Sequence, residues 1–460
     1  MKIQGVLMLV LLPLLGACVH ETGPGLSPGD TPAAFETPVP ADARVWPAVD
    51  WWRSFGSDEL NRLMVTAQQS NLDLAAAATR ILQADAQARG AGAALLPSVT
   101  FGADASRSGA VNEGTPSRTS FSMDLGASYE VDFWGRNAAH VSAADSAALA
   151  SRYDRETVAL TVTSGVATTY LQILSIRDRI TIANKSLEAA RGVLQITEAR
   201  VSAGVAVPLE LAQQRSNVAG QEATIPGLQQ EERSARATLA LLLGVPMQGF
   251  DVRGDSIASL TAPRVAAGLA SGLLARRPDV RQAEAILAGA DANVDAARAA
   301  FFPVISLSGS LGASSATLTT LLSGSNIGYA IGASLLQTIF DGGKLAADED
   351  TAIARREELL LAYRKTVITA FSDTDVALGL VVSEGEQLRL SQVQADQAAE
   401  AYRIADIRYR AGVEAFLTVL DAQRTLNAAQ AQLAAARLAR LQALVALYRA
   451  LGGGWVDARS

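Results

Sequence analysis

The sequence contains a single cysteine and only two histidines in 460 residues. One cysteine excludes intrachain disulfides and any metal site built from several cysteines. The histidines, His20 and His140, have no neighbouring residues in a spacing typical of metal binding or acid–base catalysis. We therefore expect no metal site, no catalytic residue and no cofactor, and a protein that is not an enzyme.

Aromatic residues are also scarce, at 5%, and charged residues reach only 18%. With abundant alanine, this composition suits long helices packed side by side better than one large compact core. The formal net charge is −7. The chain therefore lacks the basic surface that nucleic acid requires, and we expect no nucleic-acid partner.

Long apolar runs are missing outside the N-terminus. Lys2 precedes an apolar core from Val6 to Leu15, which is too short to span a bilayer and indicates a secretory signal over residues 1–17. Because no other run of 18 apolar residues follows, the sequence predicts no transmembrane helix in the mature chain. Any membrane crossing must then use β-strands.

The signal ends in Leu15-Gly16-Ala17-Cys18, which resembles the lipobox of bacterial lipoproteins. This resemblance implies cleavage before Cys18, a lipid on its sulfur and an acylated amine, with palmitate as a typical acyl chain. Residue 19 is valine rather than aspartate, which favours sorting to the outer membrane. Several acyl chains on one residue anchor a protein firmly, whereas one chain is marginal. A chance or buried cysteine is the alternative.

A strict alternation begins at Phe121. Odd positions as far as Phe133 are apolar, and even positions are small, polar or acidic. Period two over about 13 residues predicts a strand long enough to cross a bilayer when tilted. After Gly135, about 65 residues without proline, rich in alanine and leucine, predict one very long helix to about Val201.

Landmarks of this pattern recur at a nearly constant interval. Pro97 and Pro303 lie 206 residues apart, and Gly204 and Gly412 lie 208 apart. The interval predicts two tandem repeats, each with a helix, a β-hairpin, a very long helix, a tight break and a return helix. The predicted organisation is a signal peptide (1–17), a lipid-anchored tether and N-terminal segment (18–56), repeat 1 (57–245, strands about 98–106 and 119–133), an inter-repeat equatorial segment (246–275), repeat 2 (276–452, strands about 304–312 and 326–340) and a C-terminal tail (453–460).

Four strands with one apolar face cannot close a membrane barrel, since the smallest barrels use about eight strands. The chain must therefore oligomerise, and eight strands in a dimer or twelve in a trimer are both possible. A soluble sandwich with one wet face is the alternative. The polar even positions suit a water-filled lumen. Phe133, Trp134 and Phe340 place apolar bulk at the membrane interface.

Both hairpins carry their helices at the same end, so all helical mass lies on one side of the membrane. A helix of about 65 residues reaches on the order of 100 Å, which is a span rather than a domain core. In the last helix Val419, Ala422, Leu426, Ala429 and Leu433 keep alternating steps of three and four residues. This spacing predicts coiled-coil packing and also fits an ordinary amphipathic core.

Several short segments carry a resemblance that covers essentially the whole mature chain: Trp51-Trp52-Arg53, Leu95-Leu96-Pro97, Tyr129 to Arg136, Ile339 to Gly343, Tyr409 to Val413 and Leu420 to Gln423. The chain resembles the outer-membrane factor family of the TolC and OprM type, in its NodT-like lipoprotein branch. The resemblance implies a mainly α protein with a membrane β-barrel: a homotrimer with a twelve-stranded barrel continued by a periplasmic α-helical barrel. It also implies docking to a periplasmic membrane-fusion adaptor and an inner-membrane pump of the RND (resistance-nodulation-division) class.

The resemblance further assigns roles to the breaks and to the residues after them. Gly204-Val205 and Gly412-Val413 would be the adaptor-contacting tips, with mere loops as the alternative. Asp421 would belong to a ring of aspartates at the narrowest point, and otherwise is a solvated acid near a helix N-terminus. Tyr409 and Arg410 resemble a latch beside this gate. Thr418 stands where some relatives have a further aspartate, so we expect fewer charged residues to constrain the gate than in those relatives.

The sequence therefore favours an outer-membrane channel of a tripartite efflux system, lipid-anchored in the outer membrane with a periplasmic helical extension. It would export small molecules, such as drugs and toxic compounds, from an inner-membrane pump. A duct for type I protein secretion is the first alternative. A structural lipoprotein that bridges the envelope layers is the second, against which the four alternating strands argue.

Overall fold

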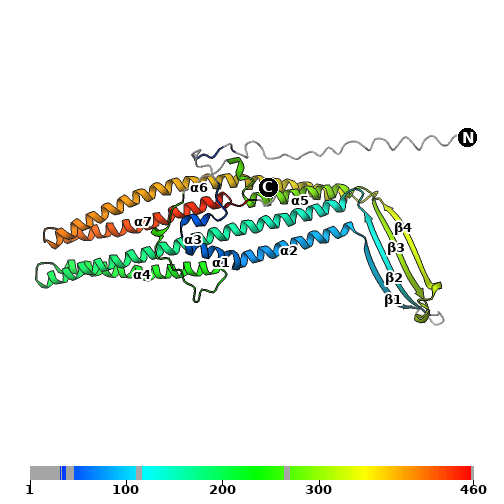
Figure 1. Ribbon diagram of the computed structural model, residues 1–460, viewed down its shortest axis with the longest axis horizontal. Coiled ribbons are helices and arrows are strands. Elements are labelled where there is room, and N and C mark those ends of the chain that lie inside the picture. The colour runs from blue at the N-terminus through cyan, green and yellow to red at the C-terminus, as the bar shows by residue number, and fades with distance from the viewer. Residues whose placement is uncertain (1–31, 33, 38–45, 110–116, 264–269, 457–460) are drawn as a thin grey trace.

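The computed structural model describes residues 32, 34–37, 46–109, 117–263 and 270–456. The predicted signal peptide, Cys18 and most of the tether lie outside the described residues. The described chain is a long rod of helices with a four-stranded sheet at one end (Figure 1). The architecture of the described residues is therefore elongated.

The elements follow the order that the sequence predicts. The first half contains η3 (Trp51–Phe55), α1 (Asp58–Ser70), α2 (Leu72–Gly92), η4 (Ala93–Leu95), β1 (Ser98–Ser108), β2 (Arg118–Val131), α3 (Arg136–Ser202) and α4 (Pro208–Leu242). The second half contains η5 (Ile257–Ser259), η6 (Ala270–Leu273), α5 (Pro278–Ala299), β3 (Val304–Ser315), η7 (Leu318–Thr320), η8 (Gly324–Asn326), β4 (Ile327–Leu336), α6 (Lys344–Arg410) and α7 (Phe416–Ala450). The long helices α3 and α6 each have 67 residues, about 100 Å.

The sheet sorts its side chains into an apolar face and a polar face. Its strands pair antiparallel in the order β1-β2-β3-β4. Directly opposed residues share a face, and one such row contains Phe101, Leu125, Leu311 and Tyr329. The adjacent row contains Gly102, Asp124, Gly312 and Gly328. The four predicted strands therefore share one apolar face, as the alternation in the sequence predicts.

The last strand is shorter than predicted, because it ends at Leu336 rather than near residue 340. Its final predicted residues turn the chain into α6 instead. The Asp341 carboxylate accepts hydrogen bonds from the backbone N–H groups of Gly343 and Leu345, at 2.9 and 2.8 Å. These bonds also lower the pKa of Asp341. Asp132 caps the start of α3 in the same way, so the strand-to-helix turn is itself repeated.

The side-by-side order of the helices gives the rod two edges: α6 forms one edge, and α2 and α4 form the other. Near the sheet the helices lie in the order α2-α3-α5-α6, and towards the far end in the order α4-α3-α7-α6 (Figure 1). Both long helices have the same length, but α6 is always at an edge and α3 never is. Among the described residues α3 exposes no large apolar side chain, whereas α6 exposes Leu361, Ile368, Val376, Leu380, Val382, Leu390, Val393, Ile404 and Ile407. An apolar helix edge of this length requires a partner, which favours association edge to edge.

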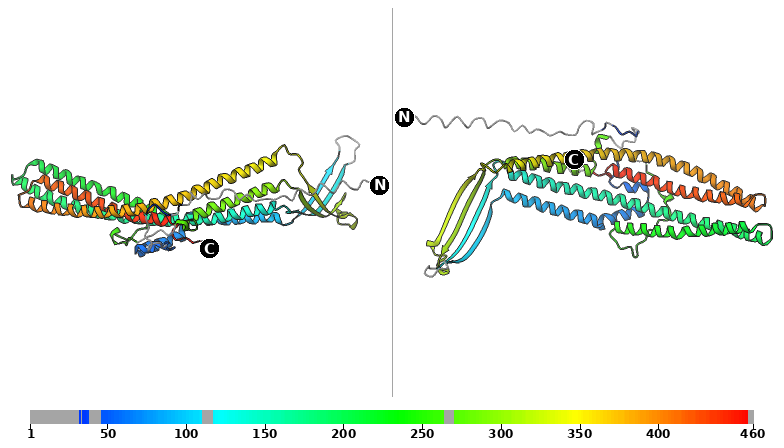
Figure 2. Two further views of the ribbon diagram at one scale, coloured as in Figure 1. Left: turned by 90° about the horizontal axis from the view of Figure 1, so that it is seen from above. Right: turned by 180° about the vertical axis from the view of Figure 1, so that it is seen from behind.

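A compact layer covers one face of the helices near the middle of the rod (Figure 2). It contains η3, α1 and the described part of the inter-repeat segment. Trp51 stacks on Tyr448 of α7 with ring centroids 4.7 Å apart, and Phe55 is fully buried. The Glu59 carboxylate accepts hydrogen bonds from the backbone N–H groups of Arg253 and Gly254, at 2.6 and 2.8 Å. We call this the equatorial layer.

Two helices of the described chain have the length and composition of a membrane span, although neither contains an unbroken run of 18 apolar residues. Helices α3 and α6 each contain an 18-residue window with a mean hydropathy of 1.3. The window is 67% buried in α3 and 33% buried in α6. Isolated polar residues interrupt the apolar runs in these windows but lower the mean hydropathy only slightly. Only the length and composition of α3 and α6 resemble those of a membrane span. The two helices run along the rod.

Candidate functional site

In each repeat, the end of the return helix contacts the start of the helix that leads to the hairpin, and the two contacts match. Both lie beside the equatorial layer. In the first repeat the Asn71 amide donates to the carbonyl of Leu242 at the end of α4, at 2.8 Å. In the second repeat the Arg277 guanidinium donates to the carbonyl of Ala450 at the end of α7, at 3.4 Å. Each return helix is thereby fixed to the start of the helix that leads to its hairpin.

Arg277 is the most buried charged side chain of this junction, at 9% exposure. Its guanidinium pairs with Asp279 at 2.6 Å and with Asp373 of α6 at 3.2 Å. Burial by itself would lower the pKa of Arg277, but its hydrogen bonds and charge pairing with both carboxylates raise that pKa above its usual value. The arginine therefore remains charged and joins α5, α6 and α7.

Aromatic side chains gather where the sheet meets the helices. Trp134 stacks on Phe302 with centroids 4.6 Å apart and packs against the edge of Phe133 at 4.8 Å. Its indole N–H donates to the carbonyl of Pro303 at 2.9 Å. Phe340 is 90% exposed, and within the described chain it makes no ring contact. Two of the three predicted interface residues thus lie together, and Phe340 lies apart from them.

The predicted tips lie at the end of the rod farthest from the sheet (Figure 1). Gly204 and Gly412 adopt positive φ values of 73° and 77°, which a residue with a side chain rarely adopts. Val205 and Val413 follow them and are 66% and 67% exposed. Each reversal therefore presents an apolar side chain at the end of the rod.

Tyr409 and Arg410, adjacent in sequence, point to different surroundings. Tyr409 is 2% exposed and packs against Phe416, while the Arg200 guanidinium of α3 lies over its ring at 4.7 Å. Arg200 also donates to the Tyr409 carbonyl at 3.3 Å. Arg410 is exposed and pairs with Asp406 at 2.9 Å. Of the two latch candidates, only Tyr409 joins one repeat to the other.

Thr418 and Asp421 both lie on the exposed surface of the first turns of α7. The Thr418 hydroxyl donates to the Glu414 carboxylate at 3.2 Å, and Glu414 also pairs with Arg408 at 3.0 Å. Within the described residues Asp421 has no hydrogen-bond or ion-pair partner. An unpaired exposed carboxylate therefore lies on α7 and is free to face solvent.

Sequence reasoning missed Arg200 and Glu414. The repeat interval of 208 residues contained a signal for the first of them, because it aligns Arg200 with Arg408 beside the latch candidates. No sequence pattern indicated that Glu414 would bridge Arg408 and Thr418. Those contacts depend on how the break before α7 folds back.

The family model described as outer membrane efflux protein matches residues 63–245 and 269–453. The chain is 45% identical over 97% of its length to the pyoverdine export outer membrane protein OpmQ of Pseudomonas aeruginosa, covering 96% of that protein. It is 43% identical to OpmQ of Pseudomonas putida, over 97% of both chains. It is 32% identical to the antibiotic efflux pump outer membrane protein ArpC of Pseudomonas putida, over 96% of this chain and 94% of that one. Among solved structures it resembles the outer-membrane channel OprN, with a TM-score of 0.85, 29% identity and coverage of 92% and 97%.

These similarities confirm the family resemblance and the fold class. Four strands per chain complete a twelve-stranded barrel in a trimer, and the helices continue it as an α-helical barrel. The predicted location in the outer membrane, with a periplasmic helical extension, is confirmed as well. The family consists of channel and transport proteins rather than enzymes. The chain therefore belongs to the outer membrane efflux protein family and is the outer-membrane channel component of an efflux system.

Proposed function

We propose that this channel exports a secreted metabolite of the siderophore class, of which pyoverdine is the example among the relatives. One observation carries the proposal. The two pyoverdine export proteins are 43% and 45% identical to this chain, whereas the antibiotic efflux protein is 32% identical at similar coverage. Drug efflux, the cargo favoured by the sequence, is the second candidate, and the 32% relative supports it.

We further propose that three copies receive this cargo from a periplasmic membrane-fusion adaptor and an inner-membrane pump of the RND class. The exposed Val205 and Val413 at the two reversals support the placement of the adaptor contact at these tips with Gly204 and Gly412. A lipid on Cys18 would anchor each copy to the outer membrane, and the aromatic cluster of Phe133 and Trp134 would sit at its inner surface.

We propose that the gate of the channel lies at the start of α7. Three copies of the unpaired Asp421 would form an acidic ring, with Thr418 one turn away. Tyr409 would hold the first repeat against the second through Arg200, and Arg410 would act only through its pairing with Asp406. The gate has one carboxylate per chain on this turn, because Thr418 carries no charge.

A deletion strain tests the cargo directly. Deletion should lower the secreted siderophore in iron-poor medium and raise its concentration in the periplasm, and the full-length gene should restore both. Normal secretion combined with increased antibiotic susceptibility would support drug efflux instead. Loss of a secreted protein from the medium, with both of these unchanged, would favour a type I secretion duct.

A further inference from the structure

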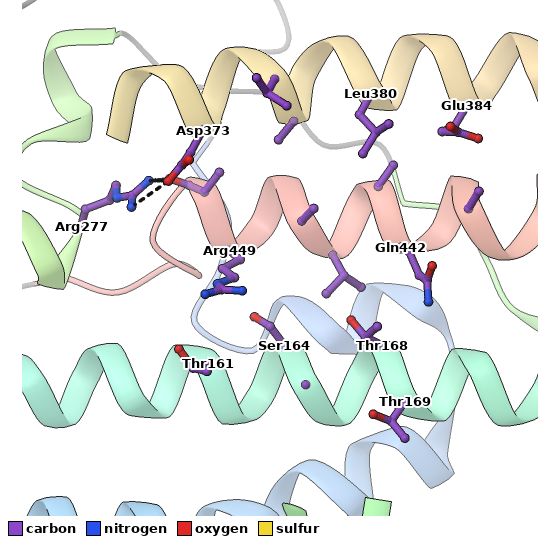
Figure 3. A pocket seen from close by; sticks show the side chains of 18 residues that line it. Thr161, Ser164, Thr168, Thr169, Arg277, Asp373, Leu380, Glu384, Gln442 and Arg449 are labelled. Carbon is purple, nitrogen blue, oxygen red and sulfur yellow. Dashed lines mark hydrogen bonds and ion pairs between the residues drawn. The ribbon is translucent and has the colours of Figure 1, made fainter. Parts of the chain in front are cut away.

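A cavity of about 850 Å³ lies between α3, α6 and α7 (Figure 3). Small residues form its floor, so three neighbouring helices leave a hollow where larger side chains would normally interlock. Those small residues are Gly165, Ala377, Ala439, Ala443, Ala446 and Ala450. The cavity borders the junction at Arg277, Asp373 and Ala450, and it is far from the tips and from the aromatic cluster.

The cavity opens on the face of the helices opposite the equatorial layer. On α3, Val162, Val166 and Tyr170 pack in the core cluster that contains the equatorial layer, whereas Thr161, Ser164 and Thr168 line the cavity. Successive residues turn by about 100° around a helix, so these two sets point in roughly opposite directions. On α7, Leu444 and Tyr448 pack in that core cluster, and Gln442, Ala446 and Arg449 line the cavity.

The side with the cavity must face the lumen of the assembled channel. When three copies close edge to edge into a tube, one face of each sheet of helices points inward and the other outward. The equatorial layer adds a second layer of helix and loop to one face only (Figure 2). Three such layers on the inside would obstruct the duct. The layer therefore lies outside, and the cavity contacts whatever passes through.

Four polar side chains around the cavity lack partners in the described part of the chain: Thr168, Glu384, Gln442 and Arg449. By contrast, Arg277 and Asp373 at one end of the cavity satisfy each other at 3.2 Å. Gln442 and Arg449 are separated by two turns of α7, about 10 Å. The cavity thus offers an anion-binding guanidinium, an amide and a hydroxyl along one apolar floor, with a free carboxylate on α6.

We propose that this cavity is a cargo-contact site, and that it takes an acidic, amide-rich amphiphile; this inference rests on the proposed function. Arg449 would bind a carboxylate of the cargo, because a guanidinium presents several N–H donors to an anion. Gln442 and Thr168 match the donors and acceptors of backbone-like amides, and the alanine floor accepts an apolar or aromatic group. Glu384 confines the anionic end to the Arg449 side by charge repulsion. Contact in a duct must be weak, since cargo has to leave as readily as it enters.

The test uses the full-length trimer in planar bilayers, with an N-acetylated acidic hexapeptide containing one tyrosine as the probe. The same peptide with its carboxylates amidated is the matched uncharged probe. The dwell time of each peptide in the current trace is measured after addition to the periplasmic side. In the unmodified channel we expect the acidic peptide to dwell longer than the amidated one.

Arg449→Gln should shorten the dwell time of the acidic peptide roughly tenfold, because a hydrogen bond to a charged group contributes about 1.5 kcal/mol or more. It should leave the amidated peptide unchanged, and Arg449→Lys should restore part of the difference. Ala446→Leu fills the floor and should shorten the dwell time of both peptides. Arg253→Gln removes the same charge from the equatorial layer and should change neither, so it serves as the control.

Equal dwell times for the acidic peptide in the unmodified and Arg449→Gln channels would overturn the inference. So would dwell times that Ala446→Leu leaves unchanged, or a current that neither peptide interrupts. If this happens while the deletion strain still loses siderophore secretion, the site fails and the proposed function stands. If peptide dwell depends on Arg449 but the deletion strain secretes normally, the cargo assignment fails and the site stands.

Discussion

Two glycines that end the return helices provide the sharpest stability prediction. Gly244 and Gly452 follow α4 and α7 with φ values of 67° and 82°. A Cβ atom on Gly244 would lie 2.0 Å from the Ser70 carbonyl oxygen, and one on Gly452 would lie 2.0 Å from the Arg276 carbonyl oxygen. Gly204 and Gly412 also have positive φ values, but a Cβ there would meet nothing within 4 Å.

These distances separate two costs. A side chain in the left-handed region costs roughly 1–2 kcal/mol at all four positions. At Gly244 and Gly452 the carbonyl must also move by more than 1 Å to reach an ordinary contact, and overpacking of this kind costs about 1–3 kcal/mol. We therefore expect Gly244→Ala and Gly452→Ala to cost about 2–5 kcal/mol each, and Gly204→Ala and Gly412→Ala only about 1–2 kcal/mol.

Thermal unfolding of the detergent-solubilised protein, followed by helical circular dichroism, measures the difference. For a chain of this length 1 kcal/mol corresponds to roughly 1 °C in the midpoint. Gly452→Ala should lower the midpoint by about 2–5 °C, and Gly412→Ala by about 1–2 °C. Equal shifts for the two variants, or a larger shift for Gly412→Ala, would refute the close packing of the return helices against the Ser70 and Arg276 carbonyls.

Three further predictions concern charge and anchoring. Asp421→Ala should reduce the preference for cations in planar-bilayer recordings, and unchanged conductance and selectivity would count against the gate. Arg277→Met removes a donor to the Ala450 carbonyl and leaves the carboxylate of Asp373 without its ion-pair partner, so it should lower the thermal midpoint by about 2–4 °C. An unchanged midpoint would show that the junction does not depend on this charge. Cys18→Ser should abolish the incorporation of radiolabelled palmitate in cells. Radiolabel in the Cys18→Ser protein would show that the lipid is attached to another residue.

The repeat and the strands could be predicted because their signals are local. Alternation from Phe121 requires only that neighbouring side chains point to opposite faces, and the long helices need only uninterrupted helix-forming residues after Gly135. The end of β4 was wrong for an equally local reason. Ile339 and Phe340 are apolar, but the chain leaves the sheet before them, and the carboxylate of Asp341 caps the start of α6.

The candidate site was less accessible from sequence because its contacts join residues that are far apart along the chain. Arg200 meets Tyr409 across 209 residues, and Arg277 meets Ala450 across 173. Neither pair follows from spacing along one helix. The cavity beside Arg449 depends on small residues from three helices at the same level, which a reading of each helix alone does not bring together.

The subunit count tests the central claim most directly, since every functional assignment requires that several copies share one tube. Native mass spectrometry of the full-length protein released from detergent measures it. We predict a complex of three chains, in which the free edges at β1 and β4, and at α6, are all paired. A stable monomer or dimer would contradict the account.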